Sequence, residues 1–563
     1  MIMKVKSKKI SLIFLLFSIS LIFSQKDQSE LIPPLDIPLS ISGTFGEIRS
    51  SHFHAGLDIK TRGKEGLKVR SVLDGKVSRI RVAISGYGKA IYVDHLNGTT
   101  SVYAHLKNFS PKIESYIKKA QYEKKSYTIE KFPKNELIVS KGEVIGFSGN
   151  TGGSSGPHLH FEIRNTKNQM PFNPMIFNID VIDTKKPVIQ KLFLFHENNF
   201  GEDIITRKIE IEKIKDGLYK TAKIYTSGKI GIGLQMYDNQ DLSQFNRNGV
   251  HSVKIFLNNK IISDYKYDNI KFDDSEYVNL LIDYKEFKSK KIRVQKLFNP
   301  NNSNISFIDK DEKNGKFSIE ENKSYDLLIE ISDFKKNTSR IKMKITGRET
   351  NFINQTNEGE LILPENEYLF KFKDQTVHLK KNTFYYPTSL NVYKDHDSIK
   401  INPDISLFKK SFSIEFFANK YDSISKRQSF IARLNKKKKI AYSPTIIKDS
   451  IFITKSVQAG TYFLAKDSIP PKIKPINFKK NQWLSKSKFL KVKIEDDLSG
   501  IKSYKGKING KWVLFEYEPK NKNLTYNFND LKFKSGKQDL KLKVTDNVGN
   551  KSIFQTTFYR KYD

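Results

Sequence analysis

The clustering of histidines constrains this chain more than any other feature of its sequence. Six of its ten histidines lie between positions 52 and 160, where an even spread over 563 residues would place about two. The chain has no cysteine, so disulfides are excluded and a transition-metal site must use histidine and carboxylate ligands, a set that zinc accepts. The clustered residues are His52, His54, His95, His105, His158 and His160.

The spacing within the cluster favours a metal site over six unrelated side chains. His54 and Asp58 are four residues apart, and His105 ends a predicted strand. His158 and His160 lie on one face of another predicted strand, because side chains alternate along a strand with period two. A single histidine is more often structural than a ligand, but four at these spacings beside a carboxylate favour metal binding.

Six short motifs surround these residues and follow one another along residues 40–175. Their content and order closely resemble the lysostaphin-type, or LytM-like, family of zinc metallopeptidases, which cut cross-links in peptidoglycan. The resemblance covers about a quarter of the chain and implies a peptidase domain built on antiparallel sheets. The motifs are Phe53-His-Ala-Gly-Leu-Asp58, Gly75-Lys-Val77, Gly86-Tyr-Gly88, Tyr103-Ala-His-Leu106, Lys141-Gly-Glu-Val-Ile-Gly146 and Thr151-Gly-Gly-Ser-Ser-Gly-Pro-His-Leu-His-Phe-Glu-Ile163.

Carried onto the matching positions, the resemblance implies that Zn²⁺ is held by His54, Asp58 and His160. It implies that His105 and His158 are a catalytic pair that does not bind the metal. Three protein ligands leave zinc a fourth position for water, as in catalytic sites. The chain has no His-Glu-x-x-His motif, so an imidazole is the natural proton acceptor near neutral pH, and the second imidazole can hydrogen-bond the developing oxyanion.

A Lys-rich insertion at residues 107–139 departs from the family pattern, in which this link is shorter. We expect it to contain a short helix at about residues 112–122 and to reshape one rim of the substrate groove. Residues 151–156, rich in glycine and serine, are expected to form a flexible loop that leads into the His158 strand.

The other candidate residues carry weaker signals. Glu162 continues the face of the His158 strand and either orients a ligand imidazole or is a plain surface carboxylate. His52 is expected to line the groove or to have no role, and His95 to be structural. Asp497 and Asp546 lie in turns that could bind calcium, although turn chemistry explains them more simply. No signal attaches to His196, His251, His378 and His396.

The rest of the chain also reads as short strands and turns, and part of it repeats. Two units share a proline-marked lead segment, an Asp-containing strand end, an Asn-containing turn and a closing strand with another Asp. Such repetition favours immunoglobulin-like β-sandwiches. The repeated stretches are 183–187, 236–262 and 328–337 in the first unit, and 467–471, 494–511 and 542–550 in the second.

The predicted fold class is therefore mainly β, an antiparallel-sheet lysostaphin-type peptidase domain followed by immunoglobulin-like β-sandwich domains. The expected organisation is a signal peptide at 1–24, an N-terminal arm at 25–40, the zinc metallopeptidase domain at 41–180, an immunoglobulin-like sandwich at 181–348, a β-rich domain without a clear motif at 349–466 and a second immunoglobulin-like sandwich at 467–563.

The N-terminus predicts where the protein acts. Lysines precede a 14-residue apolar run at residues 10–23, which is shorter than the ~20 residues of a membrane span, and Ser24 fits a cleavage site. We therefore expect an extracytoplasmic protein, in the periplasm or cell envelope or secreted, with no transmembrane span after cleavage. The net charge of +37 suits an acidic partner, and outside the cytoplasm that favours an envelope polymer over nucleic acid.

These observations lead to one main hypothesis and two rivals. The main hypothesis is a zinc metalloendopeptidase that hydrolyses peptide cross-links of peptidoglycan, with the sandwiches as separable spacers or wall-docking modules. The first rival is a non-catalytic LytM-like protein that binds wall or activates an amidase. The second is an adhesion or envelope scaffold in which the sandwiches dominate.

Overall fold

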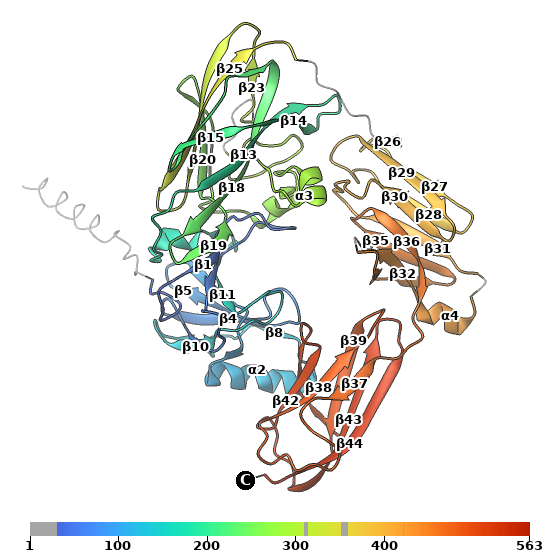
Figure 1. The fold of residues 1–563 in the computed structure, drawn as a ribbon. Coiled ribbons are helices and arrows are strands. Elements are labelled where there is room, and N and C mark those ends of the chain that lie inside the picture. Colours follow the sequence, from blue (N-terminus) through green and yellow to red (C-terminus); the bar gives the residue numbers. More distant parts are fainter. Residues whose placement is uncertain (1–30, 309–313, 351–358, 420, 436, 563) are drawn as a thin grey trace, which may run out of the picture.

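The computed structural model describes residues 31–308, 314–350, 359–419, 421–435 and 437–562, and strands dominate all of these ranges (Figure 1). The predicted mainly β fold is confirmed. The expected signal peptide lies outside the described residues. Within the described ranges, no helix is both long enough and apolar enough to cross a bilayer.

The predicted peptidase region is built on a nine-stranded antiparallel sheet. Its order is β1 (Ile41–Gly43), β2 (Leu57–Lys60), β11 (His158–Asn165), β6 (Thr99–Ala104), β5 (Lys89–His95), β4 (Gly75–Val82) and β8 (Ile129–Lys131), with β12 (Pro171–Phe172) on β11 and β9 (Ile138–Val139) on β4. A three-stranded sheet combines β3 (Lys68–Arg70), β10 (Val144–Phe147) and β7 (Asn108–Phe109), and the 3-10 helix η2 (Pro174–Phe177) follows β12.

The Lys-rich insertion folds onto this sheet. Its helix α2 (Pro111–Lys124) contains the predicted 112–122 segment and begins with a proline, whose missing N–H needs no partner in a first helical turn. Ile113 and Ile117 are buried one turn apart, so one face of the helix packs inward. The insertion then adds β8 to the sheet edge beside β4.

Three two-sheet units follow. The first unit has a six-stranded sheet and a seven-stranded sheet. The six-stranded sheet has the order β14-β13-β18-β19, with β22 and β23 paired to β18, and the seven-stranded sheet has the order β15-β16-β25-β24-β20-β21, with β17 paired to β25. The elements of this unit are β13 (Val188–Glu197), β14 (Asp203–Ile209), β15 (Ile211–Lys215), β16 (Leu218–Thr221), β17 (Ile224–Thr226), β18 (Gly228–Gln240), β19 (Ser243–Asn248), β20 (Ser252–Leu257), β21 (Lys260–Lys266), η3 (Phe272–Tyr277), α3 (Tyr284–Lys290), β22 (Gln295–Lys296), β23 (Phe317–Ile319), β24 (Ser324–Ser332) and β25 (Thr338–Gly347).

The other two units each enclose a core to which both of their sheets contribute. The middle unit pairs β26-β29-β30-β36-β32-β33 with β27-β28-β31-β35-β34, and the last pairs β37-β38-β42-β41 with β40-β39-β43-β44. That the sandwiches are immunoglobulin-like stays a prediction. The middle elements are β26 (Glu360–Ile362), β27 (Tyr368–Lys371), β28 (Gln375–Leu379), β29 (Thr388–Asp395), β30 (Ser398–Asn402), β31 (Phe412–Phe417), α4 (Ser423–Gln428), β32 (Ser429–Leu434), β33 (Ile440–Tyr442), β34 (Ile446–Lys448), β35 (Ile451–Ser456) and β36 (Gly460–Lys466). The last are β37 (Lys472–Pro475), β38 (Phe489–Glu495), β39 (Ile501–Ile508), β40 (Lys511–Val513), β41 (Phe515–Glu518), β42 (Asn523–Asn527), β43 (Gly536–Asp546) and β44 (Lys551–Arg560).

The four units follow one another around a ring, and the last returns to the first beside α2 (Figure 1). Lys89, whose side chain is 5% exposed, donates to Glu516 at 2.9 Å across this contact. Tyr122 of α2 meets Trp512 edge to face, with ring centroids 5.2 Å apart. Helix α2 of the insertion therefore forms part of the surface against which the C-terminal unit packs.

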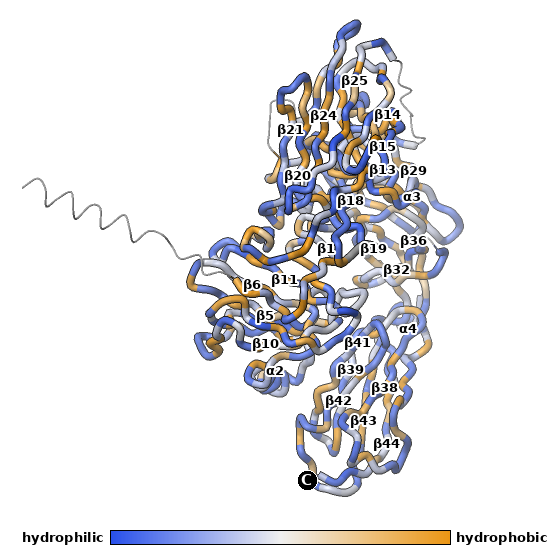
Figure 2. The backbone as a smooth tube through the Cα atoms, turned by 60° about the vertical axis from the view of Figure 1, so that its left-hand side comes forward, coloured by the Kyte–Doolittle hydropathy of each residue, from blue (hydrophilic) through white to orange (hydrophobic). Residues whose placement is uncertain are grey.

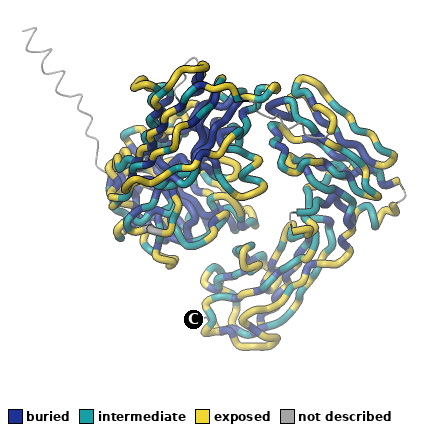
Figure 3. Tube along the Cα trace, turned by 45° about the horizontal axis from the view of Figure 1, so that its top comes forward, coloured by how far each residue is buried: buried dark blue, intermediate teal, exposed yellow. Residues whose placement is uncertain are grey.

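The peptidase region and the first sandwich share one hydrophobic core cluster, which continues from residues 31–181 into residues 189–345. Apolar and buried segments run through both units (Figures 2 and 3). Phe53 meets Phe307 edge to face at 5.2 Å between centroids, and the main chain of Gly46 lies so close to Tyr267 that a Cβ there would be 2.5 Å from its ring. This packing disagrees with the expectation that the sandwiches are separable spacers.

We predict that a fragment of residues 31–181 is much less stable than one of residues 31–348. Cutting at 181 exposes the apolar surface that Phe53 and its neighbours bury, and each large side chain contributes about 1.5–3 kcal/mol. The melting temperature of the short fragment should be lower by about 5 °C or more in circular dichroism. Equal melting temperatures for the two fragments would show that the peptidase region folds independently of the first sandwich.

Candidate metal centre and flanking histidines

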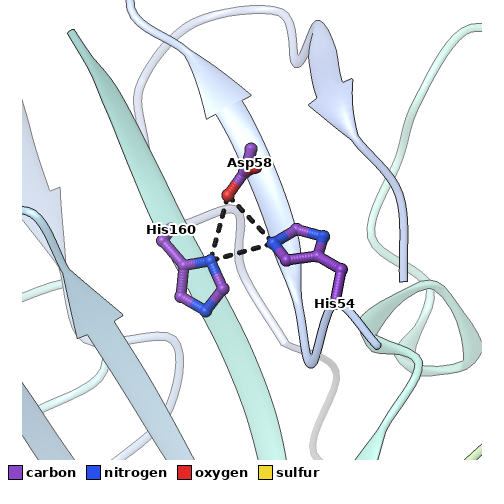
Figure 4. Close-up of side chains that lie close together, drawn as sticks. All are labelled: His54, Asp58 and His160. Carbon is purple, nitrogen blue, oxygen red and sulfur yellow. Dashed lines mark hydrogen bonds and ion pairs between the residues drawn. The ribbon is translucent and has the colours of Figure 1, made fainter. Parts of the chain in front are cut away.

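The strand register brings the predicted ligands together. β2 and β11 pair antiparallel with Asp58 directly opposite His160, so both side chains leave the same face of the sheet. His54 lies in the segment just before β2, and its main chain bonds to Glu47, N–H to carbonyl, at 2.9 Å. The three side chains converge on one point (Figure 4).

The geometry of this group fits zinc. His54 Nε2 and His160 Nδ1 each lie 3.0 Å from Asp58 Oδ1, and 3.1 Å from each other. Tetrahedral zinc with bonds of ~2.0–2.1 Å places its ligand atoms about 3.3 Å apart. The triangle is therefore close to one face of a zinc coordination sphere.

Hydrogen bonds fix which nitrogen of each histidine faces this point. His54 Nδ1 donates to the carbonyl of Thr44 at 2.8 Å, because a carbonyl can only accept, and Nε2 is left with its lone pair toward Asp58. His160 Nε2 donates to Glu162 Oε1 at 2.7 Å and leaves Nδ1 toward Asp58. Each ring therefore points its other nitrogen at Asp58, which is the orientation a metal ligand needs.

Glu162 is the centre of a buried network behind His160. It is fully buried, and it also accepts from the Tyr87 hydroxyl at 2.5 Å and from Arg164 Nε at 2.6 Å. Burial opposes its charge, but Arg164 and His160 hold the pKa of Glu162 well below its usual range. Of the two sequence interpretations, the orienting carboxylate is correct and the surface carboxylate is wrong.

The charges around the ligands reinforce one another. Burial alone raises the pKa of Asp58, but the facing imidazoles of His54, His158 and His160 hold it well below its usual range. Burial alone lowers the pKa of His160, whereas its hydrogen bonds to Asp58 and Glu162 raise it to about 9. Asp58 and Glu162 are therefore held as carboxylates on two sides of His160, and their negative charge favours a cation at this point.

His105 and His158 flank the group. Their ring centroids are 4.8 Å apart, and that of His105 is 5.9 Å from His160. His105 Nδ1 donates to the carbonyl of Thr151 at 2.8 Å, and His158 Nδ1 donates to that of Gly156 at 2.8 Å, so both rings keep Nε2 available. Burial, and then the neighbouring histidines, lower the pKa of His105 to about 3, which keeps it neutral near pH 7.

The loop that holds these two histidines is tied down rather than loose, in contrast to the expected flexible loop. Thr151 Oγ1 donates to the carbonyl of Leu106 at 2.8 Å and accepts from the N–H of Lys89 at 3.0 Å. Gly88 has φ +63°, and a Cβ there would meet Thr151 at 2.4 Å, so only glycine allows this close approach.

The remaining histidines lie outside the group. His52 is exposed, and its Nδ1 lies 3.2 Å from the hydroxyl of Ser51. His95 is buried and bonds to the carbonyl of Asp74 and to Ser101 Oγ, so its predicted structural role is confirmed. The other four histidines lie in the first and middle sandwiches, away from the group. They are His196, His251, His378 and His396.

Sequence reasoning missed three residues of the site. Arg49 donates to Asp58 Oδ2 at 2.9 Å, and Tyr87 stacks on His160 with centroids 5.2 Å apart. Arg164 carried a usable signal, since it continues the period-two face of His158, His160 and Glu162. Nothing local marks Arg49, which reaches the site only through the fold.

Comparison with known families identifies the domain around this site. The model of peptidase family M23 matches residues 52–122 and 130–174, which include the three converging ligands and both flanking histidines. The chain contains a peptidase family M23 domain. The predicted lysostaphin-type resemblance is thereby confirmed, and the interruption of the match at 123–129 falls within the Lys-rich insertion.

The similarity to individual known proteins covers a minor part of the chain. The chain is 34% identical over 140 residues to DD-carboxypeptidase/endopeptidase Mpg of Neisseria meningitidis, covering 24% of this chain and 26% of that protein. It is 28% identical over 124 residues to cell division protein DipM of Caulobacter vibrioides, covering 22% and 16%. The chain thus spans about a quarter or less of these relatives' length. Among solved structures, the lysostaphin catalytic domain of Staphylococcus simulans is 23% identical with a TM-score of 0.18, covering 24% of this chain and 88% of that one.

We predict that Glu162→Gln weakens zinc binding by the M23 domain about 10–100-fold, because it removes the carboxylate that orients His160. The measurement is competition with a zinc-binding fluorophore on the full chain. Glu143→Gln, at a half-buried position away from the ligands, is the matched control and should bind as the unchanged chain does. Equal affinities for the two variants would show that Glu162 does not support the metal.

Proposed function

We propose that this protein is a zinc metalloendopeptidase that hydrolyses peptide cross-links of peptidoglycan outside the cytoplasm. The observation that carries the proposal is the convergence of His54 Nε2, Asp58 Oδ1 and His160 Nδ1 within 3.1 Å of one another. We assign these three atoms as the zinc ligands. When bound, zinc lowers the pKa of a coordinated water and polarises the scissile carbonyl.

His105 is suited to accept the proton of the attacking water. Its Nδ1 donates to the carbonyl of Thr151, so Nε2 carries the lone pair that can accept a proton. Holding the ring by a main-chain carbonyl also fixes its direction, which general-base catalysis requires.

His158 is suited to stabilise the developing oxyanion. Its Nδ1 donates to the carbonyl of Gly156, so Nε2, which lies 3.4 Å from Asp58 Oδ1 beside the metal position, has a proton to donate only in the imidazolium form. A preorganised donor at such a point acts mainly on the transition state, so removing it lowers turnover more than substrate affinity.

The substrate and location rest on less direct support. Two relatives of the M23 domain carry names of wall-directed proteins, an endopeptidase and a cell division protein. The net charge of +37 favours an acidic envelope polymer as substrate or docking surface. Against a non-catalytic wall-binding protein or amidase activator stands the complete set of three ligand positions and two flanking imidazoles.

Replacement of single histidines in the full chain tests the proposal. His105→Ala and His158→Ala should keep one zinc per chain but lose cleavage of soluble muropeptide dimers, by ~10²–10⁴-fold and ~10²–10³-fold respectively. His54→Ala and His160→Ala should lose both zinc and cleavage, because two ligands hold zinc poorly. Zinc is measured by elemental analysis and products by mass spectrometry.

His52→Ala is the matched control, since this exposed imidazole lies outside the group and should leave zinc content and turnover unchanged. Absence of cleavage by the zinc-loaded, unsubstituted chain would favour the non-catalytic alternative. Zinc loss in His158→Ala as complete as in His160→Ala would reverse the roles of these two residues.

A further inference from the structure

The first and last sandwiches repeat an acidic group at the same structural position. In each, three aspartates from the lead segment, a first strand and a closing turn place carboxylate oxygens within 4.8 Å of one another. An asparagine side chain and a serine tie the closing strand to the lead segment in the same way in both units. The matching pairs are Asp183 with Asp467, Asp238 with Asp496, Asp333 with Asp546, Asn337 with Asn550 and Ser339 with Ser552.

In the group of the first sandwich, which we call the junction triad (Asp183, Asp238 and Asp333), two members are buried and Asp183 is half-buried. Asp238 is 1% exposed and Asp333 is 3% exposed. Among the described residues, none of the three forms an ion pair, and Lys335 nearby pairs with Asp180 at 3.8 Å. Carboxylates held this close repel one another strongly unless a proton or a metal cation lies between them.

One carboxylate oxygen of the junction triad has no partner. Asp238 Oδ1 is fully buried and makes no hydrogen bond. Across the strand pair, Asn248 lies directly opposite Asp238, and both polar atoms of its side chain are also buried without a partner. Because buried polar groups in folded proteins nearly always have partners, these atoms indicate a missing ligand.

The other two carboxylates are held in place for such a ligand. Asn337 donates its main-chain N–H to Asp333 Oδ1 at 2.9 Å and its amide to Asp333 Oδ2 at 2.7 Å. The same amide also donates to the main-chain carbonyl of Asp183 at 3.0 Å, and the N–H of Lys185 donates to Asp183 Oδ1 at 3.2 Å. The lead segment and the closing turn are thus locked together around the triad.

A small cavity of about 30 Å³ adjoins the junction triad and separates the first sandwich from the M23 domain. The cavity is large enough for one or two water molecules or an ion of similar size. Leu57 lines it from β2, on the face opposite to that of Asp58. Gln240, two residues after Asp238, accepts the N–H of Ile41 of β1 at 3.3 Å, so the triad lies where the two units join.

We propose that the junction triad binds one calcium ion beside the contact between the first sandwich and the M23 domain. The donors are all oxygens, which suit hard cations, and the set has neither the sulfur nor the imidazole that zinc prefers. His251 lines the cavity, but its Nε2 bonds to Asp268 at 2.8 Å. Calcium fits better than magnesium, because its coordination tolerates irregular geometry whereas magnesium demands a near-ideal octahedron.

The acidic group of the last sandwich supplies an internal comparison. There Asp496 Oδ2 accepts the N–H of Gly500 at 2.6 Å, and Asp467 Oδ2 accepts that of Ser499 at 3.1 Å. Turn hydrogen bonds therefore account for those carboxylates, and we assign no ion to them. The sequence interpretation of Asp546 as a turn residue agrees with its bonds to Asn550.

The test is calorimetric titration of CaCl₂ into residues 26–563 preloaded with one equivalent of zinc. We expect one calcium per chain and a rise in melting temperature of about 2 °C or more at saturating calcium. Asp238→Asn and Asp183→Asn should each lower calcium affinity at least about tenfold, and Asp238→Asn should raise the melting temperature without calcium by relieving the repulsion. Asp496→Asn is the matched control and should bind calcium as the unchanged chain does.

Several outcomes would overturn the proposal. They are the absence of calcium binding, unchanged calcium binding in both triad variants, or its loss only in Asp496→Asn. Equal affinity for MgCl₂ would overturn the assignment to calcium. Circular dichroism shows whether each variant is folded. If Asp238→Asn does not fold, the calcium affinity of Asp183→Asn is the deciding measurement. None of these results depends on zinc catalysis, so the proposed peptidase function stands or fails separately.

Discussion

Asp58 and His160 face each other across the antiparallel pair of β2 and β11, and the whole site depends on that register. A shift of one residue would turn His158, His160 and Glu162 to the opposite face of the sheet, because side chains alternate with period two. β6 fixes β11 from its other side, with Ala104 opposite His160, so that His105 emerges at the end of β6 beside the ligands. Two strand pairings thus place four of the five assigned residues.

The chemistry of the site is governed by which nitrogen of each histidine is already occupied. Main-chain carbonyls accept hydrogen bonds from Nδ1 of His54, His105 and His158, and the buried carboxylate of Glu162 accepts one from Nε2 of His160. The two proposed ligand rings and the two flanking rings therefore have fixed orientations without a metal or substrate. Such preorganisation avoids the cost of ordering these rings during the reaction.

The sandwiches are structural partners of the M23 domain rather than appendages. The first shares its hydrophobic core, and the last places Glu516 against the buried Lys89. Lys89 is also the residue whose main-chain N–H holds Thr151, which in turn holds His105. Lys89 thus connects the contact with the last sandwich to the position of His105. The Lys-rich insertion, which is longer than the family pattern, supplies part of the surface against which the last sandwich packs.

The sequence by itself determined the features that neighbouring residues encode. The period-two face of His158 and His160 and helix α2 both follow from local patterns, and the structure has both. Only the tertiary structure decided that Glu162 is buried, that Arg49 supports Asp58 and that Phe53 packs against the first sandwich. His54 and His160 are 106 positions apart, and Phe53 and Phe307 are farther still. Contacts over such separations arise from strand register and shared burial, which no local pattern contains, because their free energy comes from surfaces that meet only after the chain has folded.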